Sequence, residues 1–304
     1  MKKLASLLLA GALLCGALAG CGNEDQYAGK GPDAEASGKE ETGMSGAITV
    51  ISREDGSGTR GAFVELTGVE EKDADGNKVD NTTVDAQIAN KTDVVLTSVA
   101  GNPAAIGYVS LGSLNDTVKA LSVDGVEATT ENVKSGAYTL ARAFNIATKG
   151  EPQGVAADFI RFILSKEGQQ VVVDNKYIEI SDAAEAFASD GSSGKITVGG
   201  SSSVAPVMEK LIEAYKALNP GAQIDLQTSD STAGMTGAVD GTFDIGMASR
   251  ELKDSETAEL TGTAIALDGI AVVVHPENTL DGLTTEQIKS VYVGAVTDWS
   301  ELAA

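Results

Sequence analysis

The chain has 304 residues, of which 42% are hydrophobic and 22% charged, so it can bury the core of one large domain or of two lobes. Asp and Glu number 44 against 22 Lys and Arg, and the net charge of −22 argues against nucleic-acid binding. One His and two Cys leave little material for a metal site or a His-dependent catalytic triad. Aromatic residues, at 4%, are too sparse for a platform that stacks sugars or bases.

The first twenty residues have the pattern of a secretory signal. Lys2 and Lys3 precede an apolar stretch over residues 4–20, and polar sequence follows at once. The four residues 18–21, LAGC, resemble the bacterial lipobox. This resemblance implies that the signal peptide 1–20 is removed and that Cys21 carries lipid, including palmitate. An ordinary signal peptide with a chance Cys is the alternative.

Residues 22–46 are rich in Gly, Ser and acidic residues and lack apolar periodicity. This composition is typical of a flexible linker, so residues 21–46 are predicted to tether a soluble body. The predicted location is therefore the extracytoplasmic face of the cell membrane, with the lipid on Cys21 as the anchor.

From residue 47 onward, short apolar runs alternate with amphipathic segments. The pattern predicts strands at 47–51, 93–99, 105–109, 195–198, 224–228, 244–247 and 265–274, and helices near 61–66, 83–90, 154–173, 204–218 and 284–292. Gly168 is expected to break the long helix. Strands that alternate with helices indicate an α/β fold with largely parallel sheets, and residues 190–194 read as a linker between two halves.

Three loops share one chemistry, and each lies between a predicted strand and a predicted helix. They are residues 53–60 (REDGSGTR), 199–203 (GGSSS) and 229–234 (SDSTAG). Glycine allows a ligand to approach the backbone, Ser and Thr add hydroxyl donors, and the first N–H groups of a helix lack internal partners. Together with the helix dipole, these features favour an anion, to which Arg53 adds a forked charged donor.

Ordinary helix capping explains any one of these loops, because Ser, Thr and Gly are common at helix starts. Three of them in one secreted chain favour the anion site. None of the loops matches the G-x-x-x-x-G-K-[ST] nucleotide loop, and Gly56-Ser57-Gly58 is too short for a G-x-S-x-G nucleophile elbow.

At these loops the chain resembles the phosphate-binding proteins of bacterial phosphate ABC importers. The matching stretches are 48–63, 196–215, 228–253 and 264–299, with the runs SREDGSGTR and DIGMASRELK as the most specific parts. The resemblance implies a type II periplasmic-binding fold, in which two α/β lobes close on an anion in the cleft between them.

The two sequence halves stand in exchanged order relative to this family, as in a circular permutation. The family's own ends would be joined through about 181–195, and the new ends would lie near Ala47 and Trp299. Lobe A would then combine 47–137 with 273–304, and lobe B would be continuous over 138–272. A longer tandem gene that has been cut is the alternative.

The resemblance also implies a set of ligand residues. The family's phosphate-binding positions correspond to Arg53, Ser57, Gly58, Thr59, Ser202, Ser203, Ser231 and Ser249. Asp55 would pair with Arg53 and hold its guanidinium. Some members have an acidic residue that accepts the proton of hydrogen phosphate, at the place that reads Ala248-Ser249-Arg250 here. Asp268 or Glu251 is the candidate replacement.

The predicted function is reversible capture of inorganic phosphate and its delivery to ABC importer permease subunits. The protein is expected to act as a monomer, without a cofactor or metal and without catalysis. Alternatives are a binder of sulfate or molybdate, a surface or signalling relative that has lost the ligand, and a hydrolase using Ser57 or Ser202, which would lack a His base.

Overall fold

The computed structural model describes residues 44–181 and 184–302, all of which belong to one unit, Thr42–Ala304. The predicted signal peptide, Cys21 and nearly all of the tether lie outside the described residues. Within the described ranges, no helix combines the length and the apolarity that crossing a bilayer requires.

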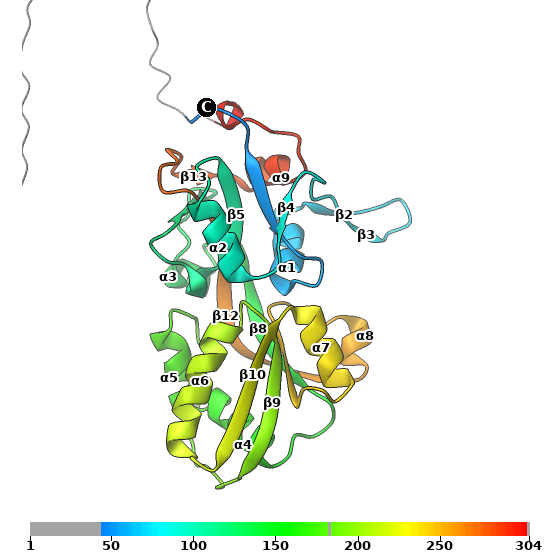
Figure 1. Ribbon diagram of the computed structural model, residues 1–304, viewed down its shortest axis with the longest axis vertical. Coiled ribbons are helices and arrows are strands. Elements are labelled where there is room, and N and C mark those ends of the chain that lie inside the picture. The colour runs from blue at the N-terminus through cyan, green and yellow to red at the C-terminus, as the bar shows by residue number, and fades with distance from the viewer. Residues whose placement is uncertain (1–43, 182–183, 303–304) are drawn as a thin grey trace, which may run out of the picture. The chain divides into compact units, whose positions relative to one another are not determined.

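Strands and helices alternate along this unit (Figure 1). The strands are β1 (Thr49–Arg53), β2 (Glu70–Lys72), β3 (Lys78–Asp80), β4 (Gln87–Ala89), β5 (Ala105–Ser110), β6 (Lys119–Ala120), β7 (Ser122–Val123), β8 (Ala141–Thr148), β9 (Gly194–Ser201), β10 (Ala222–Ser229), β11 (Ile245–Ala248), β12 (Thr261–Val274) and β13 (Gly282–Leu283). The helices are α1 (Gly58–Thr67), α2 (Thr92–Ala100), α3 (Thr130–Ser135), α4 (Gly154–Leu164), α5 (Lys166–Asp174), α6 (Ala205–Leu218), α7 (Ser231–Val239), α8 (Asp254–Thr257) and α9 (Thr285–Tyr292), with 3₁₀ turns η1 (Leu111–Ser113) and η2 (Trp299–Glu301).

The main sheet has the strand order β10-β9-β11-β8-β12-β5-β1-β4. The outer pairs β10/β9, β9/β11, β5/β1 and β1/β4 are parallel, as the alternating pattern predicts. The pairs around β8 and β12 are antiparallel. Strand β12 pairs with β8 up to Gly269 and with β5 from Ile270 onward, so this one strand connects the two halves of the sheet.

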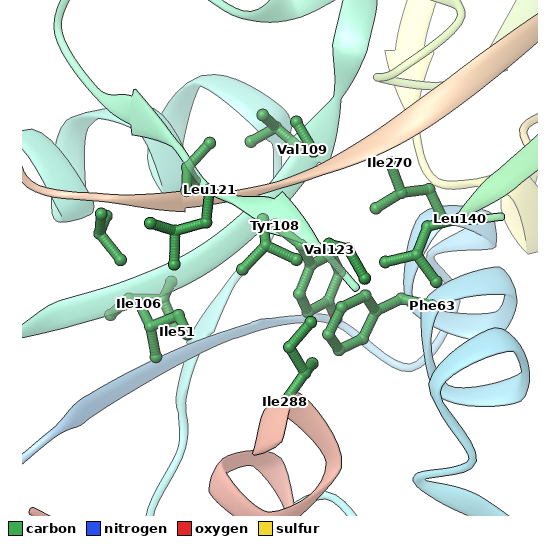
Figure 2. Close-up of a cluster of buried hydrophobic side chains, with 14 of the residues drawn as sticks. Ile51, Phe63, Ile106, Tyr108, Val109, Leu121, Val123, Leu140, Ile270 and Ile288 are labelled. Atoms are coloured by element: carbon green, nitrogen blue, oxygen red, sulfur yellow. The ribbon is translucent and has the colours of Figure 1, made fainter. Parts of the chain in front are cut away.

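Two large hydrophobic clusters lie along this sheet. The first is built by β1, β5, the end of β12, α1, α2 and α9, and Figure 2 shows its centre, where Phe63, Tyr108 and Ile288 meet. The rings of Phe63 and Tyr108 stack with their centroids 3.9 Å apart. The second cluster is built by β8–β11, α4, α5 and α6, with Phe159, Phe162 and Tyr215 among its fully buried rings.

Two of the predicted elements are wrong. Residues 83–90 form a turn and β4 instead of a helix, and residues 93–99 form most of α2 instead of a strand. The run DVVLTSV is rich in β-branched residues, which favour strands. In the fold, however, Val95 and Val99 lie four residues apart on one helical face and are buried against β5, so tertiary packing overrides the local preference.

The long helix predicted over 154–173 is interrupted, but at Ser165 rather than at Gly168. Ser165 has an extended backbone, and its hydroxyl accepts a hydrogen bond from Gly168 N at 3.2 Å, which caps α5. Gly168 lies inside α5, where a Cβ atom would overlap the carbonyl oxygen of Phe162. The glycine therefore allows the close approach of α5 to the end of α4.

Candidate functional site

The three loops occupy the positions that the sequence predicts. Residues 53–60 connect β1 to α1, residues 199–203 connect β9 to α6, and residues 229–234 connect β10 to α7. Because β9 and β10 are parallel neighbours, their carboxyl ends lie side by side, with Ser201 opposite Ser229. A fourth element, α2, begins at Thr92 beside the second loop.

Hydroxyl groups from these elements meet in one buried cluster. Thr59 Oγ1 lies 2.8 Å from Ser203 Oγ and 3.3 Å from Ser249 Oγ, and Ser231 Oγ accepts a hydrogen bond from Ser249 N at 3.1 Å. Ser202 is the most exposed member of the set at 7%. We call this set the hydroxyl cluster; its members are Thr59, Thr92, Ser201, Ser202, Ser203, Ser231 and Ser249.

Arg53 adds a guanidinium to the hydroxyl cluster. Its side chain is 2% exposed, and its Nη2 donates to Ser202 Oγ at 3.1 Å while Nη1 donates to Thr92 Oγ1 at 3.4 Å. The same guanidinium donates through Nε and Nη2 to both carboxylate oxygens of Glu54, at 2.8 and 2.7 Å. This paired, forked geometry fixes the orientation of Arg53.

The expected pairing of Asp55 with Arg53 is wrong. Asp55 is directed outward, with a side chain that is 97% exposed, and it accepts a hydrogen bond from Arg60 Nη1 at 2.8 Å. The same Arg60 nitrogen donates to the carbonyl oxygen of Arg53, also at 2.8 Å. Arg60 thus reaches back from α1 and holds the loop, while Glu54 takes the part expected of Asp55.

Ser57 and Gly58 have structural roles at the start of α1, one in helix capping and the other in loop contact. Ser57 Oγ accepts a hydrogen bond from Arg60 N at 3.3 Å, which is ordinary helix capping. The third loop packs directly against Gly58. A Cβ atom at this position would overlap Ser231 Oγ and lie 2.9 Å from Ser249 Oγ. Glycine at this position therefore lets the first and third loops come into contact.

Four helices begin at the hydroxyl cluster. Helices α1, α2, α6 and α7 start at Gly58, Thr92, Ala205 and Ser231, within three residues of a cluster member or at one. The N-terminal ends of helices carry partial positive charge, and four of them together favour a bound anion. The start of α2 is missed by sequence reasoning, because residues 93–99 are predicted as a strand.

A second buried arginine, Arg142 on β8, also contacts the cluster and is missed by sequence reasoning. Its Nη2 donates to Thr59 Oγ1 at 3.1 Å and lies 3.1 Å from Asp268 Oδ2. No strand is predicted over residues 141–148, and an arginine within this largely apolar run is the signal that could have found it. Asp268 reaches the hydroxyl cluster through Arg142, and Glu251, the other candidate acceptor, is exposed.

Burial controls the ionisation of Asp268. The carboxyl group is 0% exposed, and loss of solvation raises its pKa from 3.8 to about 6, while the positive charge of Arg142 acts in the opposite direction. Hydrogen bonds from the backbone at Leu111 and Gly112 also favour the ionised form, more weakly. Asp268 is therefore close to a change of protonation at mildly acidic pH.

This arrangement suits a small anion rich in acceptor oxygens. Hydroxyls, helix N-termini and the guanidinium of Arg53 supply donors from several directions in a buried site. Among residues 44–181 and 184–302, no group of three His, Cys, Asp or Glu side chains is placed to hold a metal ion.

Comparison with known proteins decides the family. The model of the PBP superfamily domain matches residues 27–167 and 185–304. The phosphate-binding protein PstS 2 of Streptococcus agalactiae serotype V is 47% identical over 304 residues, which cover 99% of this chain and 98% of the relative. The chain belongs to the phosphate-binding protein family of the PBP superfamily.

A solved structure of this family supports the fold. The phosphate-binding protein of a phosphate ABC transporter from Streptococcus pneumoniae TIGR4 is 50% identical and has a TM-score of 0.68, covering 84% of this chain and 100% of its own. The mixed sheet and the two hydrophobic clusters thus belong to a two-lobed type II periplasmic-binding fold.

A more distant family member matches only part of the chain. The phosphate-binding protein PstS of Bacillus subtilis is 34% identical over 146 residues, which are 47% of this chain and 45% of the relative.

Proposed function

We propose that this protein captures inorganic phosphate at the hydroxyl cluster and delivers it to the permease of an ABC importer. The observation that carries the proposal is the convergence of Arg53, Thr59, Ser202, Ser203 and Ser231, from loops far apart in sequence, on one buried point. Membership in the phosphate-binding protein family and the names of its relatives support phosphate as the anion.

Capture requires exchange of hydrogen bonds rather than chemistry. The hydroxyl of Thr59 bonds to those of Ser203 and Ser249 in this structure, so an anion would take over these bonds as it enters. A dianion stripped of water is costly unless such donors replace its hydration. The helix ends and the two guanidinium groups supply the remaining stabilisation.

The attraction is local. The whole chain carries a net charge of −22, which repels an approaching anion, although salt screens this repulsion beyond a Debye length of about 8–10 Å. Inside the site, the side chains of Arg53 and Arg142 are 2% and 5% exposed, so their charges are screened little by solvent. Affinity should therefore depend on these donors more than on the charge of the surface.

Calorimetric titration of the purified protein with phosphate and with sulfate tests the proposal. We expect stoichiometric binding of phosphate, and weaker binding of sulfate because sulfate presents no proton to a site lined with adaptable hydroxyls. No heat with near-millimolar phosphate would reject the function, and preference for sulfate would point to the other oxyanion binders. Turnover of a phosphate ester would favour the hydrolase.

The membrane anchor is a separate part of the proposal. We propose that Cys21 carries lipid after cleavage of the signal peptide, so that the monomeric protein stays on the extracytoplasmic face. The LAGC motif at residues 18–21 supports this. Replacement of Cys21 by Ala should release the protein from the membrane fraction; retention of the variant there would contradict lipid anchoring.

The lobe boundaries and the permuted order also remain proposals. Hydrophobic clustering supports lobes that meet near Leu140 and Ile270, a few residues from the boundaries 137/138 and 272/273. The ends of the described chain support permutation: Ala47 bridges Asp298, and Trp299 N donates to Gly46 O at 3.0 Å. The Bacillus subtilis relative matches over about half of each chain. Such a match is expected for permuted chains, because an alignment that keeps residue order can include only one of the two exchanged halves.

A further inference from the structure

Arg142 is held at the junction of several parts of the site. Its side chain, 5% exposed, donates from Nε to Ser249 O at 3.0 Å, from Nη1 to Gly269 O at 3.3 Å and from Nη2 to Thr59 Oγ1 at 3.1 Å. All three guanidinium nitrogens are therefore directed by fixed acceptors, and one of them faces the hydroxyl cluster.

The partner carboxylate is poorly satisfied. Asp268 Oδ2 lies 3.1 Å from Arg142 Nη2, yet within the described part of the chain this fully buried oxygen has no hydrogen bond of acceptable geometry. Asp268 Oδ1 accepts a long bond from Gly112 N, at 3.3 Å. Such a pair costs desolvation without full compensation, so stability alone is a weak reason for its presence.

We infer that Arg142 is a second anion-binding arginine of the phosphate site, and that Asp268 positions its guanidinium and sets the net charge beside the anion. This inference rests on the proposed function. Thr59 Oγ1 lies between Arg142 Nη2 and the hydroxyls of Ser203 and Ser249. An anion that replaces the bonds among these hydroxyls therefore comes within reach of Arg142.

The charge count explains the part played by Asp268. Arg53 is neutralised by Glu54, and Arg142 by Asp268, so the four groups sum to zero while both carboxylates are ionised. A proton on Asp268 changes the sum to one positive charge. The groups acting on Asp268 are Arg142 on β8, Tyr177 after α5, and Ser110 and Gly112 at the end of β5 and in η1.

Anion binding and protonation of Asp268 should therefore favour each other. Because burial raises the pKa of Asp268 to about 6, a bound dianion should draw a proton onto this carboxyl group in mildly acidic solution. A cavity of about 580 Å³ reaches Arg142 and is lined by both basic and acidic side chains, so the arginine can be approached from solvent.

Phosphate titrations of four variants test the inference. We expect Arg142→Gln to weaken binding by about 10- to 100-fold, as for loss of a charge-assisted hydrogen bond. Asp268→Asn should tighten binding at neutral pH, because it removes a negative charge beside the anion while Arg142 keeps its own charge. The same variant should abolish the extra proton uptake near pH 6, measured in two buffers of different ionisation enthalpy. The double variant Arg142→Gln/Asp268→Asn should bind as weakly as Arg142→Gln.

The double variant also separates binding from folding, because it leaves no buried charge without a partner. Its thermal midpoint should stay near that of the wild type. Arg161→Gln is the matched control: it removes one arginine whose recorded partners, Asp158 and Asp190, do not contact the hydroxyl cluster, and it should leave the affinity unchanged.

Wild-type affinity in the folded double variant would overturn the inference, and so would an Asp268→Asn variant as weak as Arg142→Gln. Either result leaves the proposed function intact. A wild-type protein that binds no phosphate would instead remove the proposed function, and this inference with it.

Discussion

Arg53 Nη2 donates a hydrogen bond to Ser202 Oγ at 3.1 Å, although 149 positions separate the two residues in the chain. The bond joins the end of β1, which packs in the first hydrophobic cluster, to the loop after β9, which belongs to the second. The hydrogen bond that links the two lobes here is therefore also part of the anion site.

Replacement of Arg53 by Ala should weaken phosphate binding by about 30-fold or more, or ~2 kcal/mol, because a buried charge-assisted donor is lost. The substitution also leaves the Glu54 carboxylate without its partner. The double variant Arg53→Ala/Glu54→Gln removes that unpaired charge, so its phosphate affinity should be measured as well. Calorimetry measures both affinities. Undiminished affinity in both variants would exclude Arg53 from the site.

Gly58→Ala should impair binding while leaving helix α1 intact. The added methyl group would overlap Ser231 Oγ and hold the first and third loops apart. Gly61→Ala is the matched control in the same helix, since the nearest atom to its Cβ is Arg250 Cδ at 3.9 Å. We expect phosphate affinity to fall at least tenfold, about 1.4 kcal/mol, in the first variant and to stay unchanged in the second. Equal affinities would show that close loop contact is dispensable.

The contribution of Asp268 to the free energy of unfolding should fall as pH rises from about 4 to about 6. Its pKa is raised from 3.8 to about 6, so across this interval the folded state binds this proton more readily than the unfolded state. The contribution is favourable at low pH and lost above the folded pKa, by roughly 1–3 kcal/mol. Other acidic groups titrate in the same range and mask this change in the wild type alone.

Urea unfolding of the wild type and of Asp268→Asn, at pH 4.5 and pH 7, isolates that contribution. The wild type should lose more stability, or gain less, than the variant over this interval, because the amide side chain of the variant does not titrate. A constant difference between the two proteins at both pH values would show that Asp268 ionises normally in the fold.

The neighbouring chain ends predict that a re-permuted protein will fold. Gly46 N donates to Asp298 Oδ1 at 3.1 Å, and Ile48 N donates to Thr297 O at 2.8 Å, so a short Gly/Ser linker can join Leu302 to Gly46. New ends can be opened within residues 190–193, which precede β9 and carry no helix. We expect cooperative unfolding and phosphate affinity close to that of the wild type. An unfolded product would argue against the permutation.

The sequence predicts the local parts of the site better than their partners. Strand, hydroxyl loop and helix follow one another within a few residues, so the positions of Ser202, Ser231 and Thr59 could be inferred from pattern alone. Thr92 could not be found in this way, because the β-branched run that follows it predicts a strand. Packing on β5 makes this run a helix instead.

Pairings between side chains were the least predictable feature. Glu54 and Asp55 are adjacent acids, and only the turn that directs Asp55 to solvent determines that Glu54 meets Arg53. Arg142 and Asp268 lie on β8 and β12, and their contact depends on the register of an antiparallel pair, in which Asp268 stands opposite Arg142. No local motif encodes such a register.

Thr59 has a single hydroxyl hydrogen but three polar neighbours, at Ser203, Ser249 and Arg142. Because Arg142 must donate, Thr59 can donate to only one of the two serines, and that choice constrains which way each serine hydroxyl turns. Removing any one of these hydroxyls would therefore rotate its neighbours. A bound anion would then meet a different set of hydrogen-bond donors, and not simply one contact fewer.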